Sequence, residues 1–243
     1  MKLRILSYNI QSCLGIDNRW EWRRSVADIA ALNPDVAAVQ EVAINRPNST
    51  EPVDYPAEAA AALGMNVIFG KALDFANGGE YGVAVFSRFP LEKIAQLPLP
   101  VPREAEPRTV LIVKVLSDEP FYVVCTHFPF QGEYENDDAG RRQIAQFIHD
   151  FIVEKKLFPC LLAGDLNSAP DSEAIQFLRK NWLVLNDRGS KRPTAETSKY
   201  GWQEIDFICA YPPEAAGNVN FVTASEMEAS DHYLIYADME LKK

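Results

Sequence analysis

The sequence predicts an α/β fold in which two β-sheets pack together and helices cover them on the outside. Apolar strand-like segments outnumber amphipathic helices, and several pairs of strands have connections of hairpin length. Many of these segments are continuously apolar, which is typical of strands covered on both faces. The length of 243 residues, 47% of them hydrophobic, allows a large core. We expect a single domain spanning residues 1–243.

The first half of the chain predicts a strand, a helix and then further strands. Residues 2–9 (KLRILSYN) alternate in polarity and indicate a strand. An amphipathic helix follows, with Trp22, Val26 and Ile29 on one face, and Asn33-Pro34 ends it. Further strands are expected at residues 35–40, 65–70, 81–87 and 91–97, with a second helix at 57–64.

The second half predicts a hairpin and two more helices. Residues 108–116 and 121–127 form the hairpin, and residues 139–155 form the most regular helix in the sequence. His149 lies off the apolar stripe of that helix, so we expect it to be exposed to solvent. Further strands are expected at residues 158–164, 204–210, 218–222 and 233–240, with a helix at 172–180.

The charge balance argues against stable capture of nucleic acid. The net charge is −10 and the isoelectric point is about 4.9, whereas tight binding of DNA or RNA requires clustered Lys and Arg. Transient cleavage of nucleic acid is still allowed. No apolar run approaches the roughly 20 residues that cross a bilayer, and the first residues lack signal-peptide features. We therefore expect a cytoplasmic protein, or a secreted one if a signal was removed.

The four cysteines predict buried free thiols. Cys125, Cys160 and Cys209 lie in or beside apolar runs, and no CxxC pair accompanies them or Cys13. A zinc cluster lacks the required ligand spacing. Disulfides are the alternative, but buried thiols that act as small hydrophobic side chains fit these positions better.

Several predicted strands finish with a residue suited to binding a hard cation or moving a proton. Because strand ends that meet at one rim can build a site from distant sequence, we expect these side chains to converge. An aspartate between Ile205 and Phe207 also requires a polar partner, since a buried carboxylate is costly without one. The residues concerned are Asn9, Glu41, His127, Asp165, Asn167, Asp206, Asp231 and His232.

Seven short motifs in order make the sequence resemble the endonuclease/exonuclease/phosphatase superfamily, which includes DNase I-like nucleases, inositol polyphosphate phosphatases and bacterial sphingomyelinases. The motifs are SYNI, QE, SRFP, THF, GDLN, IDFI and SDHY, and they extend from about residue 6 to residue 233. The resemblance implies a four-layer αββα sandwich of two mixed sheets. It also implies hydrolysis of phosphoesters by in-line attack of water, dependent on Mg²⁺ or Mn²⁺.

The resemblance assigns metal binding and water activation to acidic and amide side chains. Glu41 is expected to be the main metal ligand, with Asn9 and Asp231 contributing directly or through water. Asp165 is expected to orient or deprotonate the attacking water, and Asn167 to hold water or a phosphate oxygen. Mg²⁺ prefers such oxygen ligands.

By resemblance, His127 and His232 are expected to bind the phosphoryl group and assist proton transfer. By resemblance, Asp206 orients His232, and Glu80 is the candidate partner of His127. Arg88 and Arg108 are further candidates for phosphate binding, although structural roles are favoured for both.

The substrate remains open within this class of enzyme. The sequence has no basic stripe with interleaved aromatic residues, which single-strand binding uses, so we expect a small or soluble phosphoester. A magnesium-dependent nuclease acting on DNA or RNA is the alternative enzyme. A catalytically silent binding module on the same fold is the alternative from another class. The sequence does not indicate an oligomeric state.

Overall fold

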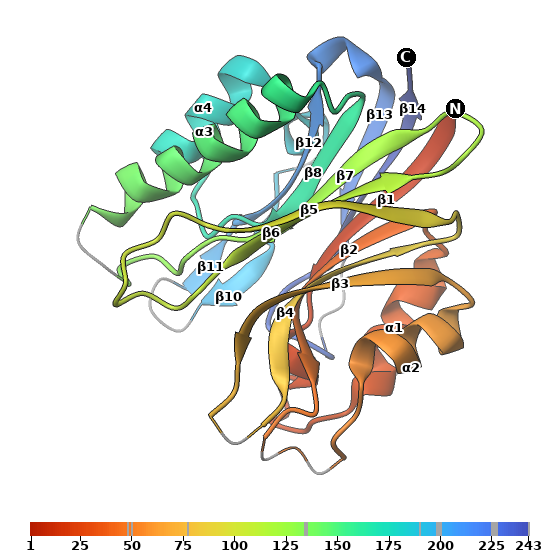
Figure 1. The fold of residues 1–243 in the computed structure, drawn as a ribbon, viewed down its shortest axis with the longest axis vertical. Coiled ribbons are helices and arrows are strands. Elements are labelled where there is room, and N and C mark those ends of the chain that lie inside the picture. Colours follow the sequence, from red (N-terminus) through yellow and green to blue (C-terminus); the bar gives the residue numbers. More distant parts are fainter. Residues whose placement is uncertain are drawn as a thin grey trace.

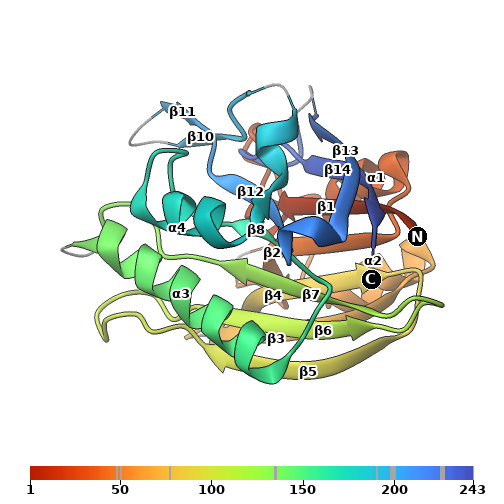
Figure 2. The ribbon, with the colours of Figure 1, turned by 90° about the horizontal axis from the view of Figure 1, so that it is seen from above.

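Two six-stranded β-sheets pack face to face, and helices cover both outer faces (Figures 1 and 2). This arrangement, seen in a computed structural model, confirms the predicted α/β sandwich. The structure describes residues 1–243 except 48, 50, 77, 134, 135, 190, 198–200, 225–227 and 243.

The first sheet is mixed and contains the N-terminal strand. Its strand order is β13-β14-β1-β2-β4-β3, with only β1 and β2 parallel. Helices α1 (Trp22–Leu32) and α2 (Tyr55–Leu63) cover its outer face. The strands are β13 (Ala216–Thr223), β14 (Ile235–Leu241), β1 (Lys2–Asn9), β2 (Val36–Ile44), β4 (Glu80–Ser87) and β3 (Asn66–Asp74).

The second sheet has the order β5-β6-β7-β8-β12-β9, with only β7 and β8 parallel. Helices α3 (Asp137–Lys155) and α4 (Glu173–Asn181) cover its outer face. A separate hairpin is formed by β10 (Ala195–Thr197) and β11 (Gly201–Gln203). The strands are β5 (Leu91–Pro98), β6 (Thr109–Val115), β7 (Phe121–His127), β8 (Cys160–Asp165), β12 (Asp206–Tyr211) and β9 (Leu183–Val184). Short 3₁₀ helices are η1 (Gln11–Cys13), η2 (Leu185–Arg188) and η3 (Pro213–Ala215).

Burial on both faces explains the continuously apolar strands. In β1, Leu3 and Ile5 face the second sheet, whereas Leu6 and Tyr8 face the layer of α1. All four are buried. A strand in a central layer therefore has no solvent-facing side on which polar residues would alternate.

The expected helices and longer strands are present, with small shifts at their ends. Helix α2 begins at Tyr55, two residues before the prediction, because the Asp54 side chain caps it by accepting from the Ala57 N–H at 3.1 Å. Strand β2 continues to Ile44 beyond its predicted end. Strands β9, β10 and β11 were not predicted, because they are only two or three residues long.

The prediction of a solvated His149 is wrong. Its Nδ1 atom accepts a hydrogen bond from the indole N–H of Trp182 at 3.1 Å, and its ring packs edge-on against Phe177 and Tyr211. His149 therefore belongs to an aromatic cluster between α3, α4 and the end of β12. The four cysteines are free and buried, as predicted. None of the helices in the described residues combines the length and hydrophobicity needed to cross a bilayer.

Candidate active site

The parallel strand pair in each sheet carries polar residues to one rim of the sandwich. Asn9 ends β1, Glu41 directly follows the part of β2 that pairs with β1, and His127 and Asp165 end β7 and β8. One pocket of about 480 Å³ lies at this rim. Its polar lining consists of Glu41, Arg108, His127, Asp165, Asn167, Thr197, Asp231 and His232. Seven of these eight residues were predicted from sequence as site candidates.

A β-bulge in β2 aims Glu41 at the pocket. Between Val39 and Val42 the strand has one more residue than its partner β4 has between Ala84 and Gly82. In a regular strand Glu41 would point to the same side as Val39, which packs in the layer of α1. The bulge returns Val42 to that side and leaves Glu41 with a left-handed φ of 57°. The backbone is strained where the side chain turns into the pocket.

Asn9 links the two sheets across the pocket floor. Its Nδ2 group donates to Glu41 Oε1 at 3.1 Å and to Asp165 Oδ2 at 3.0 Å. Its Oδ1 atom accepts the Gln11 N–H at 3.0 Å. In this orientation Asn9 positions the two carboxylates, because its oxygen is used by the backbone.

Asp165 is held from several directions and stays ionised. Its Oδ1 accepts the Asn167 N–H at 2.9 Å, and its Oδ2 lies 3.3 Å from His127 Nε2 and 3.7 Å from His232 Nε2. Burial alone would raise the pKa of Asp165. The two imidazoles outweigh burial and hold that pKa below its usual range.

Arg108 and Asp165 hold His127 from two sides. The guanidinium only donates hydrogen bonds, and its Nη1 atom lies 2.8 Å from His127 Nδ1. The other ring nitrogen, Nε2, lies 3.3 Å from Asp165 Oδ2. Asn167 closes this side of the pocket, with its amide 3.1 Å from His127 Nε2 and 3.0 Å from the Phe128 carbonyl oxygen.

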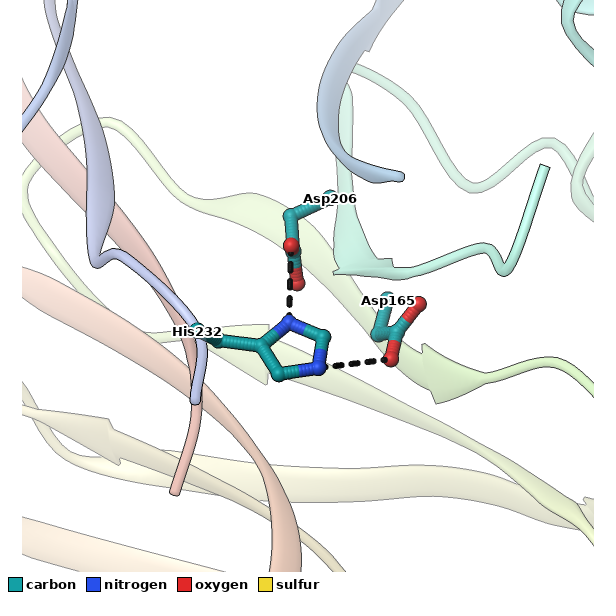
Figure 3. A group of neighbouring side chains, drawn as sticks. All are labelled: Asp165, Asp206 and His232. Atoms are coloured by element: carbon teal, nitrogen blue, oxygen red, sulfur yellow. Dashed lines mark hydrogen bonds and ion pairs between the residues drawn. The ribbon is translucent and has the colours of Figure 1, made fainter. Parts of the chain in front are cut away.

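His232 lies between Asp206 and Asp165 (Figure 3). Its Nδ1 is 2.9 Å from Asp206 Oδ2, which also accepts from Thr194 Oγ1 at 2.6 Å. Burial lowers the pKa of an imidazole, but Asp206 outweighs it and raises the pKa of His232 to about 10. Burial raises the pKa of Asp206. We conclude that His232 is protonated and that Nε2–H points toward Asp165.

Asp231 faces Glu41 across the opening of the pocket and accepts from Gln11 Nε2 at 2.9 Å. Burial raises the pKa of Asp231 to about 6, and the negative charge of Glu41 adds to the shift while His232 opposes it. Two carboxylates that repel each other in one pocket make a natural cation site. Their oxygens are the ligands that Mg²⁺ prefers.

Turning the Asn9 amide over would complete this oxygen donor set. The flip would place Oδ1 against the carboxylates of Glu41 and Asp165, which is favourable only with a cation between them. A second group, Asp165, Asp206 and His232, is compact enough to hold a metal ion, with ligand atoms within 4.8 Å of one another. However, Asp206 already accepts hydrogen bonds from His232 and Thr194, so this group is better suited to holding a proton.

Two predicted residues do not line the pocket. Because β4 runs antiparallel to β2, Ser87 pairs with Val36 at the opposite end of the sheet, and Arg88 binds Asp35 and the Asn33 carbonyl oxygen there. Glu80 begins β4 and pairs with Lys71 of the neighbouring strand β3 at 3.5 Å. The structure therefore places neither Arg88 at a phosphate site nor Glu80 beside His127.

Four residues of the site were missed in the sequence. Thr197 lines the pocket, Gln11 contacts Asp231, Thr194 contacts Asp206, and Ser230 Oγ donates to the Asn9 carbonyl oxygen at 2.7 Å. Gln11 follows the motif SYNI and Ser230 begins the motif SDHY, so their position in the sequence was the available signal. Thr194 lies in a polar segment with no motif, and only the folded chain brings it to Asp206.

Comparison with solved structures shows what this fold is similar to. An endonuclease/exonuclease/phosphatase from Beutenbergia cavernae is 22% identical, with a TM-score of 0.81 over 99% of this chain and 72% of that one. A mannosyl-6-phosphatase from Bacteroides thetaiotaomicron is 15% identical, with a TM-score of 0.70 over 98% and 99%. Sphingomyelinase C from Streptomyces griseocarneus is 17% identical, with a TM-score of 0.71 over 98% and 99%.

Sequence comparison gives a more direct assignment. No curated protein matches the chain. The family model described as "Endonuclease/Exonuclease/phosphatase family" matches residues 6–232, which include every residue of the pocket. With the same fold and an acidic, histidine-containing pocket at one rim of the sandwich, the chain belongs to the endonuclease/exonuclease/phosphatase family.

Proposed function

We propose that this protein is a divalent-metal-dependent hydrolase of phosphoester bonds, in which water attacks in line with the leaving oxygen. We further propose that residues 1–243 act as one catalytic domain. The observation that carries the proposal is the pocket itself. It combines a pair of carboxylates, Glu41 and Asp231, with two imidazoles that flank one buried carboxylate, Asp165.

Asp165 is suited to orienting the attacking water. Its hydrogen bonds fix both oxygens, and its lowered pKa keeps it ionised but makes it a weak base. A fixed carboxylate that accepts one water hydrogen selects the direction of attack, which is how positioning lowers a barrier. We assign Asp165 to water orientation and to transient acceptance of the water proton.

His232 is suited to neutralising negative charge and donating a proton. As an imidazolium held by Asp206 it carries a donor, Nε2–H, into the pocket. Such a group neutralises negative charge on the phosphoryl oxygens and supplies a proton to the leaving oxygen. His127, Arg108 and Asn167 line the other side and are positioned to bind the remaining phosphoryl oxygens.

The metal site would be formed by Glu41 and Asp231, with Asn9 joining them after its amide turns over. Enzymes of this family generally use divalent metals. A bound Mg²⁺ or Mn²⁺ would supply positive charge to the non-bridging oxygens.

A small or soluble phosphoester fits the site best. The net charge of −10 disfavours long polyanions, and the phosphoryl-binding residues lie in a single pocket, part of which is open to solvent. The names of two similar structures, a mannosyl-6-phosphatase and a sphingomyelinase, refer to a phosphomonoesterase and a phosphodiesterase. Both bond types therefore belong in the first test.

The test is hydrolysis of p-nitrophenyl phosphate and bis(p-nitrophenyl) phosphate with Mg²⁺ or Mn²⁺. We expect turnover of at least one ester, abolished by EDTA and restored by added metal. Asp165→Asn should reduce turnover by about 10²-fold or more with an unchanged melting temperature. Asp238→Asn, which removes a surface partner of Arg4, is the matched control and should leave turnover unchanged.

The same assay separates the alternatives. Cleavage confined to DNA or RNA would make the protein a nuclease. No metal-dependent turnover across esters, sugar phosphates, phospholipids and nucleic acids would contradict the proposed activity and favour a silent binding module.

A further inference from the structure

A second recess lies beside the catalytic pocket, between the segment that follows β1 and the segment that follows β2. It encloses about 380 Å³ of empty space, part of it open to solvent. Its polar lining comes from Ser12, Trp20, Trp22, Arg46, Ser49, Glu51 and Tyr55. None of these residues takes part in the chemistry proposed above.

The recess contains buried donors that have no acceptor. Within the described part of the chain, the indole nitrogens of Trp20 and Trp22 and the hydroxyls of Ser12 and Ser49 are buried and lack any hydrogen-bond partner. An indole N–H can only donate. Folded proteins rarely leave buried donors unsatisfied, so four around one recess indicate an occupant rich in acceptor atoms.

Arg46 adds an uncompensated positive charge to these donors. Its guanidinium lies over the rings of Trp20, at 5.7 Å, and Phe75, at 6.0 Å. No ion pair between described residues includes it. Glu51, the carboxylate in the lining, pairs instead with Arg23 at 3.1 Å. A guanidinium beside aligned N–H and O–H donors matches the oxygens of a phosphate or carboxylate.

Residues that line this recess lie close in the chain to residues of the catalytic site. Gln11, Ser12 and Cys13 have successive left-handed φ values of 45°, 48° and 66°. Such strain persists only where the surroundings enforce it, often at ligand clamps. Ser12 follows Asn9 by three residues, at most about 11 Å of chain. On the second segment, Ala43 lines the recess two residues after Glu41.

We propose that this recess binds an oxyanion, namely an acidic group of the substrate other than the phosphoryl group that reacts. The inference rests on the proposed function and narrows it, since the preferred substrate then carries a phosphoester and a second phosphate or carboxylate. Arg46 supplies charge, and Trp20, Trp22 and Ser12 supply neutral donors. Because the recess adjoins Asn9 and Glu41 through the chain, a compact substrate can reach both sites.

Binding is tested first without turnover. Inorganic phosphate is titrated into metal-free protein by calorimetry and by tryptophan fluorescence, since two of the four tryptophans line the recess. We expect Arg46→Gln to weaken phosphate binding about tenfold, the scale of one charge-assisted contact. Trp22→Phe, which keeps a ring but removes the donor, should also weaken it. Arg142→Gln removes an equal charge from α3 and should change nothing.

Two results of the titration would overturn the proposal. One is the absence of phosphate binding at millimolar concentrations, which would mean that water satisfies the donors. The other is binding that Arg46→Gln leaves intact but His232→Ala abolishes, which would place the phosphate in the catalytic pocket only.

Kinetics then test the role in substrate binding. A sugar monophosphate and its bisphosphate are compared as substrates of the wild-type enzyme and Arg46→Gln. We expect the variant to raise KM about tenfold for the bisphosphate and to leave KM for the monophosphate unchanged. Equal effects on both substrates would overturn the substrate role. If neither ester is hydrolysed, the proposed function fails, while the phosphate titration still decides whether the recess binds an oxyanion.

Discussion

At the scale of single residues, the site works by giving neighbouring carboxylates different charge environments. Asp165 receives two imidazoles and stays ionised, whereas Asp231 faces Glu41 and has a pKa raised to about 6. Among the described residues, the Asp206 carboxylate bonds to His232 and Thr194 through one oxygen and to none through the other. Carboxylates whose pKa values differ in this way can take different roles. Asp231 suits metal binding, Asp165 suits orienting the attacking water, and Asp206 suits holding His232 in its protonated form.

Asp206→Asn tests the support of His232. Removing this carboxylate should lower the pKa of His232 from about 10 and misplace its ring proton. We expect turnover to fall by about 10²-fold or more. If His232 acts as the acid, activity is lost as pH rises through its pKa, so the alkaline limb of the pH–rate profile should move to lower pH. The measurement is kcat across pH, with Asp238→Asn as control. An unchanged rate and profile would contradict the role of His232.

The residues that could not be predicted show where sequence patterns end. Four site residues follow apolar runs, and this pattern was enough to predict that they lie together: Asn9, Glu41, His127 and Asp165. Arg88 also follows a strand, but an antiparallel one, and nothing in its motif reveals the direction of the strand.

At the scale of elements, the two parallel strand pairs, β1–β2 and β7–β8, determine which strand ends lie at the same rim of the sandwich. Their register places His127 opposite Asp165 and Asn9 opposite Gln40. Apolar runs and stop signals were sufficient to predict the longer strands. They did not predict β9 to β11, since two or three residues carry no periodicity, nor the bulge at Glu41, which interrupts the alternation that identifies a strand.

Gly164→Ala tests how closely β7 and β8 must approach. A Cβ at this position would lie 2.1 Å from the Thr126 backbone oxygen, so β8 would have to move away from β7. We expect a loss of stability of about 1–3 kcal/mol and a loss of turnover, because His127 and Asp165 separate. Chemical denaturation and kcat are the measurements.

Gly64→Ala is the matched control for this substitution. Gly64 has a positive φ at the end of α2 with open space around it, so alanine should cost about 1 kcal/mol of local strain and leave kcat unchanged. Equal effects of the two substitutions on kcat would contradict the assignment of Gly164.

At the scale of the whole molecule, three apolar clusters divide the sandwich, and each contains a thiol. Cys125 lies between the sheets, Cys160 and Cys209 lie under α3 and α4, and Cys13 lies in the layer of α1. Burial raises the pKa of all four, to about 12 for Cys13 and Cys125. Since the thiolate is the reactive form, the cysteines should be inert in the folded protein.

Thiol labelling therefore reports unfolding of each layer. We expect the native protein to show negligible reaction with Ellman's reagent at pH 8 and the denatured protein to release four equivalents, one for each cysteine. Intermediate denaturant should expose all four together if the layers unfold cooperatively. Rapid labelling of one cysteine in the native state would contradict the burial described for its layer.

The bond from Ser230 to the Asn9 carbonyl oxygen joins segments 221 residues apart. Asn9 ends the first strand, whereas Ser230 directly precedes Asp231 and His232. A fragment that stops before residue 230 therefore lacks Asp231 and His232, one carboxylate of the proposed metal site and the proposed acid. We expect such fragments to be inert, because hydrolysis requires residues 230–232 to be made and docked against the end of the first strand.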